Sequence, residues 1–377
     1  MNFNIKVIVS HILPILVILL FSCALFYPQL NGSKINSGDI VSSVAKTKHV
    51  KDYQKETGER SYWNASQFSG GPIYLLNLGE DSNLLRYIHK TFTLNKLGAI
   101  GMFLAIGIAM YLSLSLMGVN KWLSLTISLA YMLNLVFFTL IEAGHNKKVY
   151  TLIYLPLIIS GVMMLFKSNI LKGAVALLIG TSLSIYAGHV QMVYYLIITL
   201  VGFGIPFLVY AIKSKQLKSF LPGVGIAFFI AILAALTNFA QLKSSQEFAQ
   251  QTMRGGAVLE NNDASKNDKG LQWDYAMSWS YEIKDFFNFL VPRVVGGGSN
   301  EFVDKDNEIA QLMLKNNAQV VNGKVGIPGY WSTMPFTSGG AYIGAAFFFL
   351  FVLSLFLLKK EYTFAFISAF VIIFLLS

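Results

Sequence analysis

The chain has 377 residues, of which 54% are hydrophobic and only 13% are charged. A soluble domain has about 25% charged residues, so this composition excludes an ordinary soluble protein and indicates an integral membrane protein. The net charge of +10 would suit a nucleic-acid-binding protein. In a membrane protein, however, the lysines of short loops mark the cytoplasmic side, so we expect no nucleic-acid partner.

The first apolar segment, residues 7–27, is long enough to cross the bilayer and is predicted to be a signal-anchor helix. A cleaved signal peptide has a shorter apolar core. The single cysteine, Cys23, lies within this segment, so no internal disulfide is expected. A lipoprotein cleavage site is disfavoured because the apolar run continues beyond Cys23.

Eight further apolar segments follow, and each is long enough for a membrane-spanning helix. They are residues 97–117, 122–142, 149–166, 169–187, 190–212, 219–240, 338–358 and 361–377. The sequence therefore predicts an all-α polytopic membrane protein with about nine transmembrane helices. The predicted organisation is a first helix (1–27), a first outer loop (28–96), helices two to seven (97–240), a large outer loop (241–337) and helices eight and nine (338–377).

The positions of the lysines predict the orientation. If the N-terminus is cytoplasmic, nine lysines lie in inner connections and only Lys147 and Lys148 lie in outer turns. The positive-inside rule therefore places both large polar segments outside. The inner connections are short and contain no GxxxxGK[ST] phosphate loop, so ATP-driven chemistry is not expected. His11 is the main ionisable residue within a span, which disfavours an ion-coupled transporter.

The tripeptide Ala-Gly-His ends both the third and the fifth predicted span, at 143–145 and 187–189. One interpretation is that both histidines cap helix C-termini, where a positive charge is favourable. The other is that His145 and His189 belong to one outer site, and the repetition at two outer turns favours it. Further site candidates beside these turns are Glu142, Lys147, Lys148 and Gln191.

Lys147 and Lys148 oppose the orientation bias, which suggests that they have a use on the outer side. A lipid phosphate would be a suitable partner for a lysine ammonium. The alternative is that both side chains simply extend to the headgroup region.

Three candidates come from the polar outer segments. Asp39 lies about eleven residues beyond the first span, where a carboxylate could act as a general base, although Gly-Asp is also a common turn sequence. Arg254 precedes two glycines and could bind an anion, or it could lie in a solvated turn. Trp63 could stack on a sugar ring, although packing is the commoner role of an aromatic side chain.

Several motifs together resemble the YfhO-like bacterial membrane proteins, most closely those of Bacteroidetes-type bacteria. The matching segments are 38–39, 59–63, 68–72, 143–147, 188–192, 275–281, 330–331, 335–337 and 342–344. That family belongs with the GT-C class of glycosyltransferases. The resemblance implies a GT-C-like fold in a bacterial cytoplasmic membrane, with the active face outward.

The resemblance also implies an activity. The expected enzyme moves a sugar from a polyprenyl-phosphate donor to an extracytoplasmic polymer, lipid or protein, with inversion at the sugar carbon. Asp39 would be the catalytic carboxylate, and His145, Lys147, Lys148 and Arg254 would bind the donor phosphate. A divalent metal is used by some members of the wider class, but the sequence shows no metal-ligand cluster. Because the apolar run continues to Ser377, the resemblance also implies an N-terminal portion of a longer protein.

Two other functions remain open at the level of sequence. A transporter or flippase of lipid-linked saccharides would need a polar path through the membrane. A non-enzymatic membrane scaffold would need no catalytic group. Exchange of Asp39 should affect only the enzyme.

Overall fold

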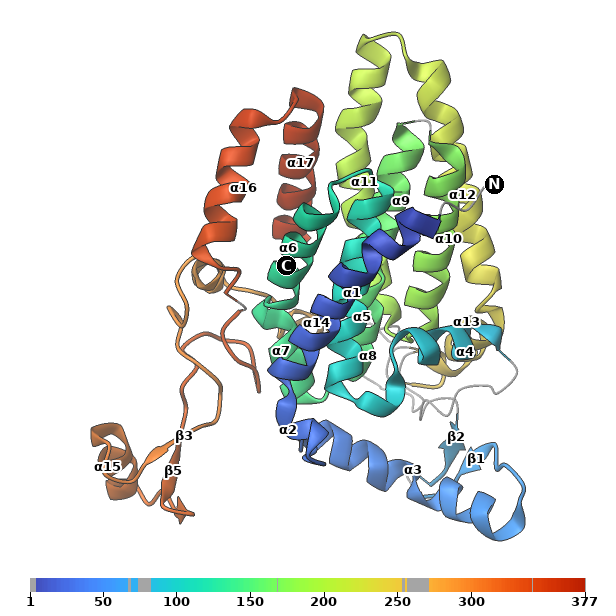
Figure 1. Cartoon of the computed structure of the whole chain (residues 1–377). Coiled ribbons are helices and arrows are strands. Elements are labelled where there is room, and N and C mark those ends of the chain that lie inside the picture. The colour runs from blue at the N-terminus through green and yellow to red at the C-terminus, as the bar shows by residue number, and fades with distance from the viewer. Residues whose placement is uncertain are drawn as a thin grey trace, which may run out of the picture. The chain divides into compact units, whose positions relative to one another are not determined.

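The computed structural model describes residues 5–66, 69–73, 83–167, 169–252, 255, 271–340 and 342–376, with side chains from residue 9 onward. The described chain is mainly helical (Figure 1). It divides into two compact units, which we treat separately. Unit 1 consists of Met1–Leu133, Phe137–Glu247 and Lys359–Leu375, and unit 2 of Asn134–Val136, Phe248–Leu358 and Leu376–Ser377.

The N-terminal part of unit 1 consists of helices and one small antiparallel sheet. The elements are α1 (Ile5–Leu25), α2 (Tyr27–Leu30), α3 (Gly38–Thr57), β1 (Trp63–Asn64), β2 (Gly71–Pro72), α4 (Leu84–Phe92), η2 (Asn95–Leu97), α5 (Ala99–Leu116), α6 (Lys121–Met132) and α7 (Leu135–Ala143). Strands β1 and β2 pair with each other.

The remaining helices of unit 1 complete a bundle in which α1, α5, α6 and α8 to α12 run side by side (Figure 1). They are α8 (Asn146–Ile153), α9 (Leu155–Phe166), α10 (Ile170–Tyr186), α11 (Val190–Lys213), α12 (Leu217–Leu236), α13 (Phe239–Ala249) and α17 (Lys360–Leu376).

Several helices are long and apolar enough to cross a membrane, which confirms the prediction of a helical membrane protein. Within the described residues there are four: α5, the continuous pair α8–α9, α11 and α12. The pair α6 and α7 makes a fifth if it counts as one span bent by 43°. Helices α1, α10, α16 and α17 overlap the other four predicted spans, but α10 has 17 residues and α16 has 13, because α16 begins at Ala345 and not at 338. The number of nine spans therefore stays a prediction.

The core of unit 1 surrounds α5, whose side chains are buried on nearly all sides. Phe103, Ile106 and Tyr111 from this helix meet Ile18 of α1 and Met132 of α6 in one apolar cluster. A helix that is apolar around its whole circumference is expected at the centre of a bundle. His11, the ionisable residue within the first predicted span, has a polar partner in this bundle, because its Nδ1 contacts the hydroxyl of Tyr111.

Unit 2 contains most of the second predicted outer segment together with α16. Its elements are α14 (Trp273–Met277), η3 (Ile283–Phe289), β3 (Glu301–Asp304), α15 (Glu308–Lys315), β4 (Val320–Val321), β5 (Lys324–Ile327) and α16 (Ala345–Leu357). The strands form an antiparallel sheet in the order β3-β5-β4. The buried carboxylate of Asp285 accepts hydrogen bonds from the hydroxyls of Tyr330 and Ser332, at 3.0 and 2.9 Å, which holds this loop-rich unit together.

Candidate functional site

Asp39 lies in the first turn of α3, a helix that runs across one end of the bundle of unit 1 (Figure 1). The helix begins here because Ser37 is its N-cap, and the Ser37 hydroxyl accepts a hydrogen bond from the Ile40 amide at 3.3 Å. A negative charge in the first turn also suits the positive end of the helix dipole. The Asp39 side chain is 60% exposed, so a ligand can reach it.

The imidazole of His145 contacts this carboxylate, with 3.1 Å between Nε2 of His145 and Oδ2 of Asp39. His145 follows a tight turn in which Gly144 has a φ of +85°. A Cβ atom at Gly144 would lie 2.3 Å from the Ser37 hydroxyl oxygen and 2.9 Å from the Asp39 Cβ. Glycine is required both by the left-handed backbone and by this close approach. The turn after α7 therefore presses against the start of α3 and brings Asp39 and His145 together.

Lys147 connects the first Ala-Gly-His turn to the second. A Cβ atom at Gly188 would lie 3.2 Å from the Lys147 ammonium and 3.3 Å from Nε2 of Gln241, a residue of α13. The Lys147 side chain therefore extends from the start of α8 to the turn between α10 and α11. Gln241 thereby joins the candidate site, although no sequence pattern pointed to it.

His189 lies close to the two lysines, Lys147 and Lys148. Its pKa is lowered below the ordinary histidine value, first by burial and then by the positive charges of Lys148 and Lys147, with His145 also contributing. The structure thus brings together four of the predicted site residues around the two Ala-Gly-His turns, and Asp39 joins them through His145. An anion bound here would face several cationic groups.

The two histidines occupy equivalent positions. Each is the N-cap residue of the following helix, α8 or α11, and each follows a glycine with a φ near +85°. A positive charge at a helix N-terminus faces the positive end of the dipole. The His145 backbone amide also donates a hydrogen bond to the Leu140 carbonyl at the end of α7, so both interpretations of the histidines, as caps and as members of a site, stay open.

The bundle has a polar interior near these turns. Within the described residues, several buried side-chain atoms there have no hydrogen-bond partner: His189 Nδ1, Asn146 Oδ1, Thr151 Oγ1, Ser182 Oγ and Asn238 Oδ1. Buried polar atoms are usually paired. Two hydrogen bonds nevertheless link helices here. The Ser184 hydroxyl of α10 donates to the Thr151 carbonyl of α8. The Asn238 amide, between α12 and α13, donates to the Ser182 carbonyl of α10. This end of the bundle therefore suits a polar ligand better than an acyl chain.

The other predicted candidates lie outside the contact between Asp39 and His145. Glu142 is exposed at the end of α7, and Gln191 donates a hydrogen bond to the Tyr195 hydroxyl at 2.6 Å. Trp63 is half-exposed in β1. Its neighbour Asn64 binds the Lys46 carbonyl, which lies about 10 Å along α3 from Asp39 at 1.5 Å per residue. Arg254 lies outside the described residues.

His89 is a buried residue that the sequence did not single out. Its Nδ1 lies 2.8 Å from the hydroxyl of Tyr154, and its ring packs edge-on against Tyr150. Burial, with a smaller effect of Lys90, lowers the pKa of His89 to about 4. A lone histidine in an amphipathic segment gives no sequence signal that it faces the bundle.

The buried His89 predicts a stability that depends on pH. Its folded pKa of about 4 lies below the unfolded value of about 6.5. The stabilisation from neutral His89 is therefore complete above pH 6.5 and is lost as the pH falls towards 4. Lowering the pH from 7 to 5 should cost about 2 kcal/mol of unfolding free energy. Denaturation of the detergent-solubilised protein at both pH values measures this loss.

The control for this prediction is the exposed His49 on α3. His89→Gln should reduce the difference in stability between pH 7 and pH 5, whereas His49→Gln should leave it unchanged. An unchanged difference in His89→Gln would show that another group causes the pH dependence.

Within the described part of the chain, these residues form no candidate metal site. No group of three or more His, Cys, Asp or Glu side chains is placed there to hold a metal ion.

No protein-family model matches the sequence, and no curated protein or solved structure matches it significantly. The function is therefore inferred from the geometry of unit 1.

Proposed function

We propose that the protein is a membrane glycosyltransferase that moves a sugar from a polyprenyl-phosphate-linked donor to an extracytoplasmic acceptor. The observation that carries this proposal is the 3.1 Å contact between Asp39 and His145 beside Lys147 and Lys148. It places a carboxylate and several cationic groups at one end of a bundle of apolar helices. A carboxylate can accept the proton of an acceptor hydroxyl, and cationic groups can stabilise the charge that develops on a leaving phosphate.

In the proposed reaction, Asp39 accepts the proton of an acceptor hydroxyl while the acceptor oxygen attacks C1 of the sugar. The bond from C1 to the phosphate oxygen breaks, and its electron pair leaves with the polyprenyl phosphate. Direct displacement inverts the configuration at C1. His145 holds Oδ2 of Asp39, which leaves Oδ1 for the acceptor.

The cationic groups stabilise the leaving phosphate. Lys147 and Lys148 supply positive charge where negative charge develops, and such electrostatic stabilisation is commonly a large contribution to catalysis. Arg254 is a further proposed phosphate ligand. The phosphate is already a competent leaving group, so the transfer needs no ATP.

The proposal includes a GT-C-like arrangement with nine spans, a cytoplasmic N-terminus and an outward active face in a bacterial cytoplasmic membrane. The lysine bias of the short connections supports this orientation. Helices at all nine predicted segments support the number of spans. The direction of α3 across the end of the bundle supports a site at the membrane surface.

A transfer assay tests the class of donor. The purified full chain, reconstituted in phospholipid vesicles, receives a radiolabelled sugar on polyprenyl phosphate together with extracted cell-envelope material. We expect label in the envelope material and release of polyprenyl phosphate. The same sugar supplied as a nucleotide sugar is the matched donor control and should give no transfer.

Two results would contradict the proposal. Transfer from the nucleotide sugar alone would assign a different donor class. Movement of the intact labelled lipid between leaflets, without transfer, would favour the flippase.

A further inference from the structure

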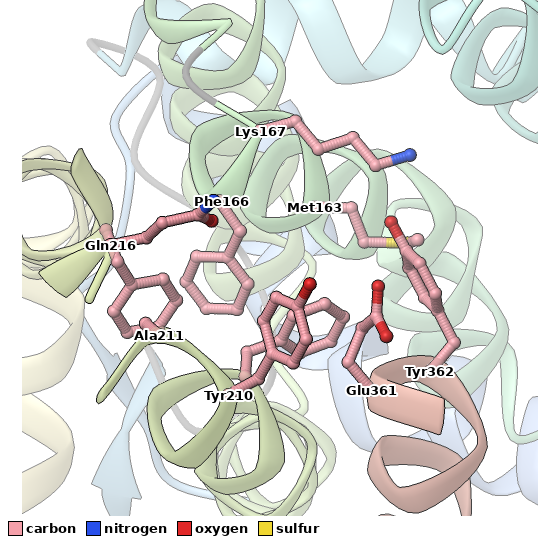
Figure 2. A pocket seen from close by; sticks show the side chains of 10 residues that line it. Met163, Phe166, Lys167, Tyr210, Ala211, Gln216, Glu361 and Tyr362 are labelled. Carbon is pink, nitrogen blue, oxygen red and sulfur yellow. The ribbon is translucent and has the colours of Figure 1, made fainter. Parts of the chain in front are cut away.

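We propose that unit 1 also binds the headgroup of an aminophospholipid, in a pocket at the end of the bundle opposite to Asp39 and His145. This pocket has a volume of about 140 Å³. It lies where α9 and α11 end and where α12 and α17 begin (Figure 2). The continuous helix Asn146–Phe166 has 21 residues, so about 30 Å separates its two ends at 1.5 Å per residue. The pocket is therefore distinct from the proposed catalytic site.

Two opposite charges line this pocket. Lys167 comes from the end of α9 and Glu361 from the first turn of α17. In the described structure neither side chain forms an ion pair with a protein group, although the Lys167 ammonium lies 5.4 Å from the centre of the Tyr362 ring. Figure 2 shows Lys167 and Tyr362 on one side of the pocket and the Glu361 carboxylate pointing into it. A ligand with both a negative and a positive group would pair with both charges.

The surroundings of the pocket favour a phosphate as the negative group. Lysines are dense in the adjoining connections, at 213, 215, 218, 359 and 360. Glu361 is the one acidic residue of the sequence segments 213–218 and 359–361. The cluster of lysines attracts a lipid phosphate, which Lys167 would bind as a point charge. A purely anionic headgroup would leave Glu361 facing negative charge.

A primary ammonium fits the other half of the pocket. It can donate hydrogen bonds to the Glu361 carboxylate, and the rings of Tyr210 and Tyr362 can add cation–π attraction. A cavity of about 150 Å³ holds one benzene molecule, so this pocket has room for a small headgroup without the acyl chains. Only 22% of the apolar window of α11, and the same share of α12, is buried. The acyl chains therefore have exposed apolar helix surface to lie against.

Thermal unfolding of the delipidated full chain in detergent tests this proposal. Equal concentrations of phosphatidylethanolamine, phosphatidylglycerol and phosphatidylcholine with matched acyl chains are added. We expect phosphatidylethanolamine to raise the melting temperature by about 2–4 °C more than the other two lipids. Soluble phosphoethanolamine at the same concentration should give a smaller shift, because it lacks the acyl chains.

Two variants locate the effect. Glu361→Gln should abolish the preference for phosphatidylethanolamine over phosphatidylglycerol, and Lys167→Gln should reduce the shift produced by every lipid. Lys172→Gln is the matched control, since this exposed lysine of α10 does not line the pocket. If Lys167→Gln does not fold, native mass spectrometry of Glu361→Gln replaces it as the test. The adducts of this variant should show no preference for phosphatidylethanolamine over phosphatidylglycerol.

Three outcomes would overturn the proposal. One is a larger shift with phosphatidylglycerol than with phosphatidylethanolamine in the unmodified protein. The second is a preference for phosphatidylethanolamine that survives in Glu361→Gln. The third is an equal shift with soluble phosphoethanolamine, which would assign the pocket to a soluble ligand. None of these measurements depends on sugar transfer, so the proposal can fail independently of the proposed enzyme.

Discussion

Exchanging Asp39 for Asn is expected to reduce sugar transfer about 10²–10⁴-fold, because an amide cannot accept the proton of the acceptor hydroxyl. The variant should insert and fold normally. The Asp39 side chain of the unmodified protein is 60% exposed. An exposed ion pair contributes only about 0–1 kcal/mol to stability, so its loss should cost little. The transfer rate from the polyprenyl-phosphate donor, normalised to the amount of folded protein in the vesicles, measures the effect.

Asp52→Asn is the matched control. Asp52 lies on the same helix, α3, where it forms an exposed ion pair with Lys48. This variant removes the same charge from the same helix but should leave sugar transfer unchanged. Full activity in Asp39→Asn, or an equal loss in both variants, would contradict the role of Asp39 as a base. A flippase or a scaffold should be insensitive to both exchanges.

A double-mutant cycle extends this test to His145. If His145 acts by positioning Asp39, then His145→Gln should lower the transfer rate of the unmodified protein but have little further effect in Asp39→Asn. Residues that act as a unit show such non-additive effects. Additive losses would mean that His145 has a separate role at the donor phosphate.

Exchanging Gly161 for Leu is expected to destabilise unit 1 by about 3 kcal/mol, near the upper end of the usual cost of overpacking. Gly161 of α9 faces Gly173 of α10. A Cβ atom at Gly161 would lie 2.7 Å from the Leu177 nitrogen and 2.9 Å from the Gly173 oxygen. Both are backbone atoms, so no side-chain rotation can relieve the clash. Small residues let transmembrane helices approach this closely.

The control is the same exchange at Gly225 of α12, where a Cβ atom would meet nothing within 4 Å. Gly225→Leu should be neutral or stabilising, since leucine has a higher helix propensity than glycine. Thermal unfolding in detergent compares the two variants. Equal stability of the two variants would show that α9 and α10 do not pack through Gly161.

The apolar helices were predictable, but their shape was not. Residues 122–142 were expected to form one span, whereas α6 and α7 meet there at a bend of 43°. The Asn134 side chain accepts a hydrogen bond from the Val136 amide at 3.0 Å, next to this break. Such a local bond competes with the helical pattern. Hydropathy averaged over a window is insensitive to a single residue of this kind.

The candidate site was predictable only in part. The repeated Ala-Gly-His turns drew attention to His145, His189 and the neighbouring lysines, and these residues do lie together. Asp39 was suggested by family resemblance, since a Gly-Asp pair by itself indicates only a turn. Gln241 and the buried His89 gave no signal. Their positions depend on which helices pack beside them.

The sequence by itself determined that the chain forms apolar helices suited to a membrane, because hydropathy is a local property of each segment. It also contained the repeated Ala-Gly-His tripeptide and the two lysines that follow its first copy. Only the tertiary structure decided that Asp39 meets His145, through the close approach that Gly144 permits, and that Lys167 and Glu361 share a pocket. Contacts between segments far apart in the chain depend on helix packing, which no single segment encodes.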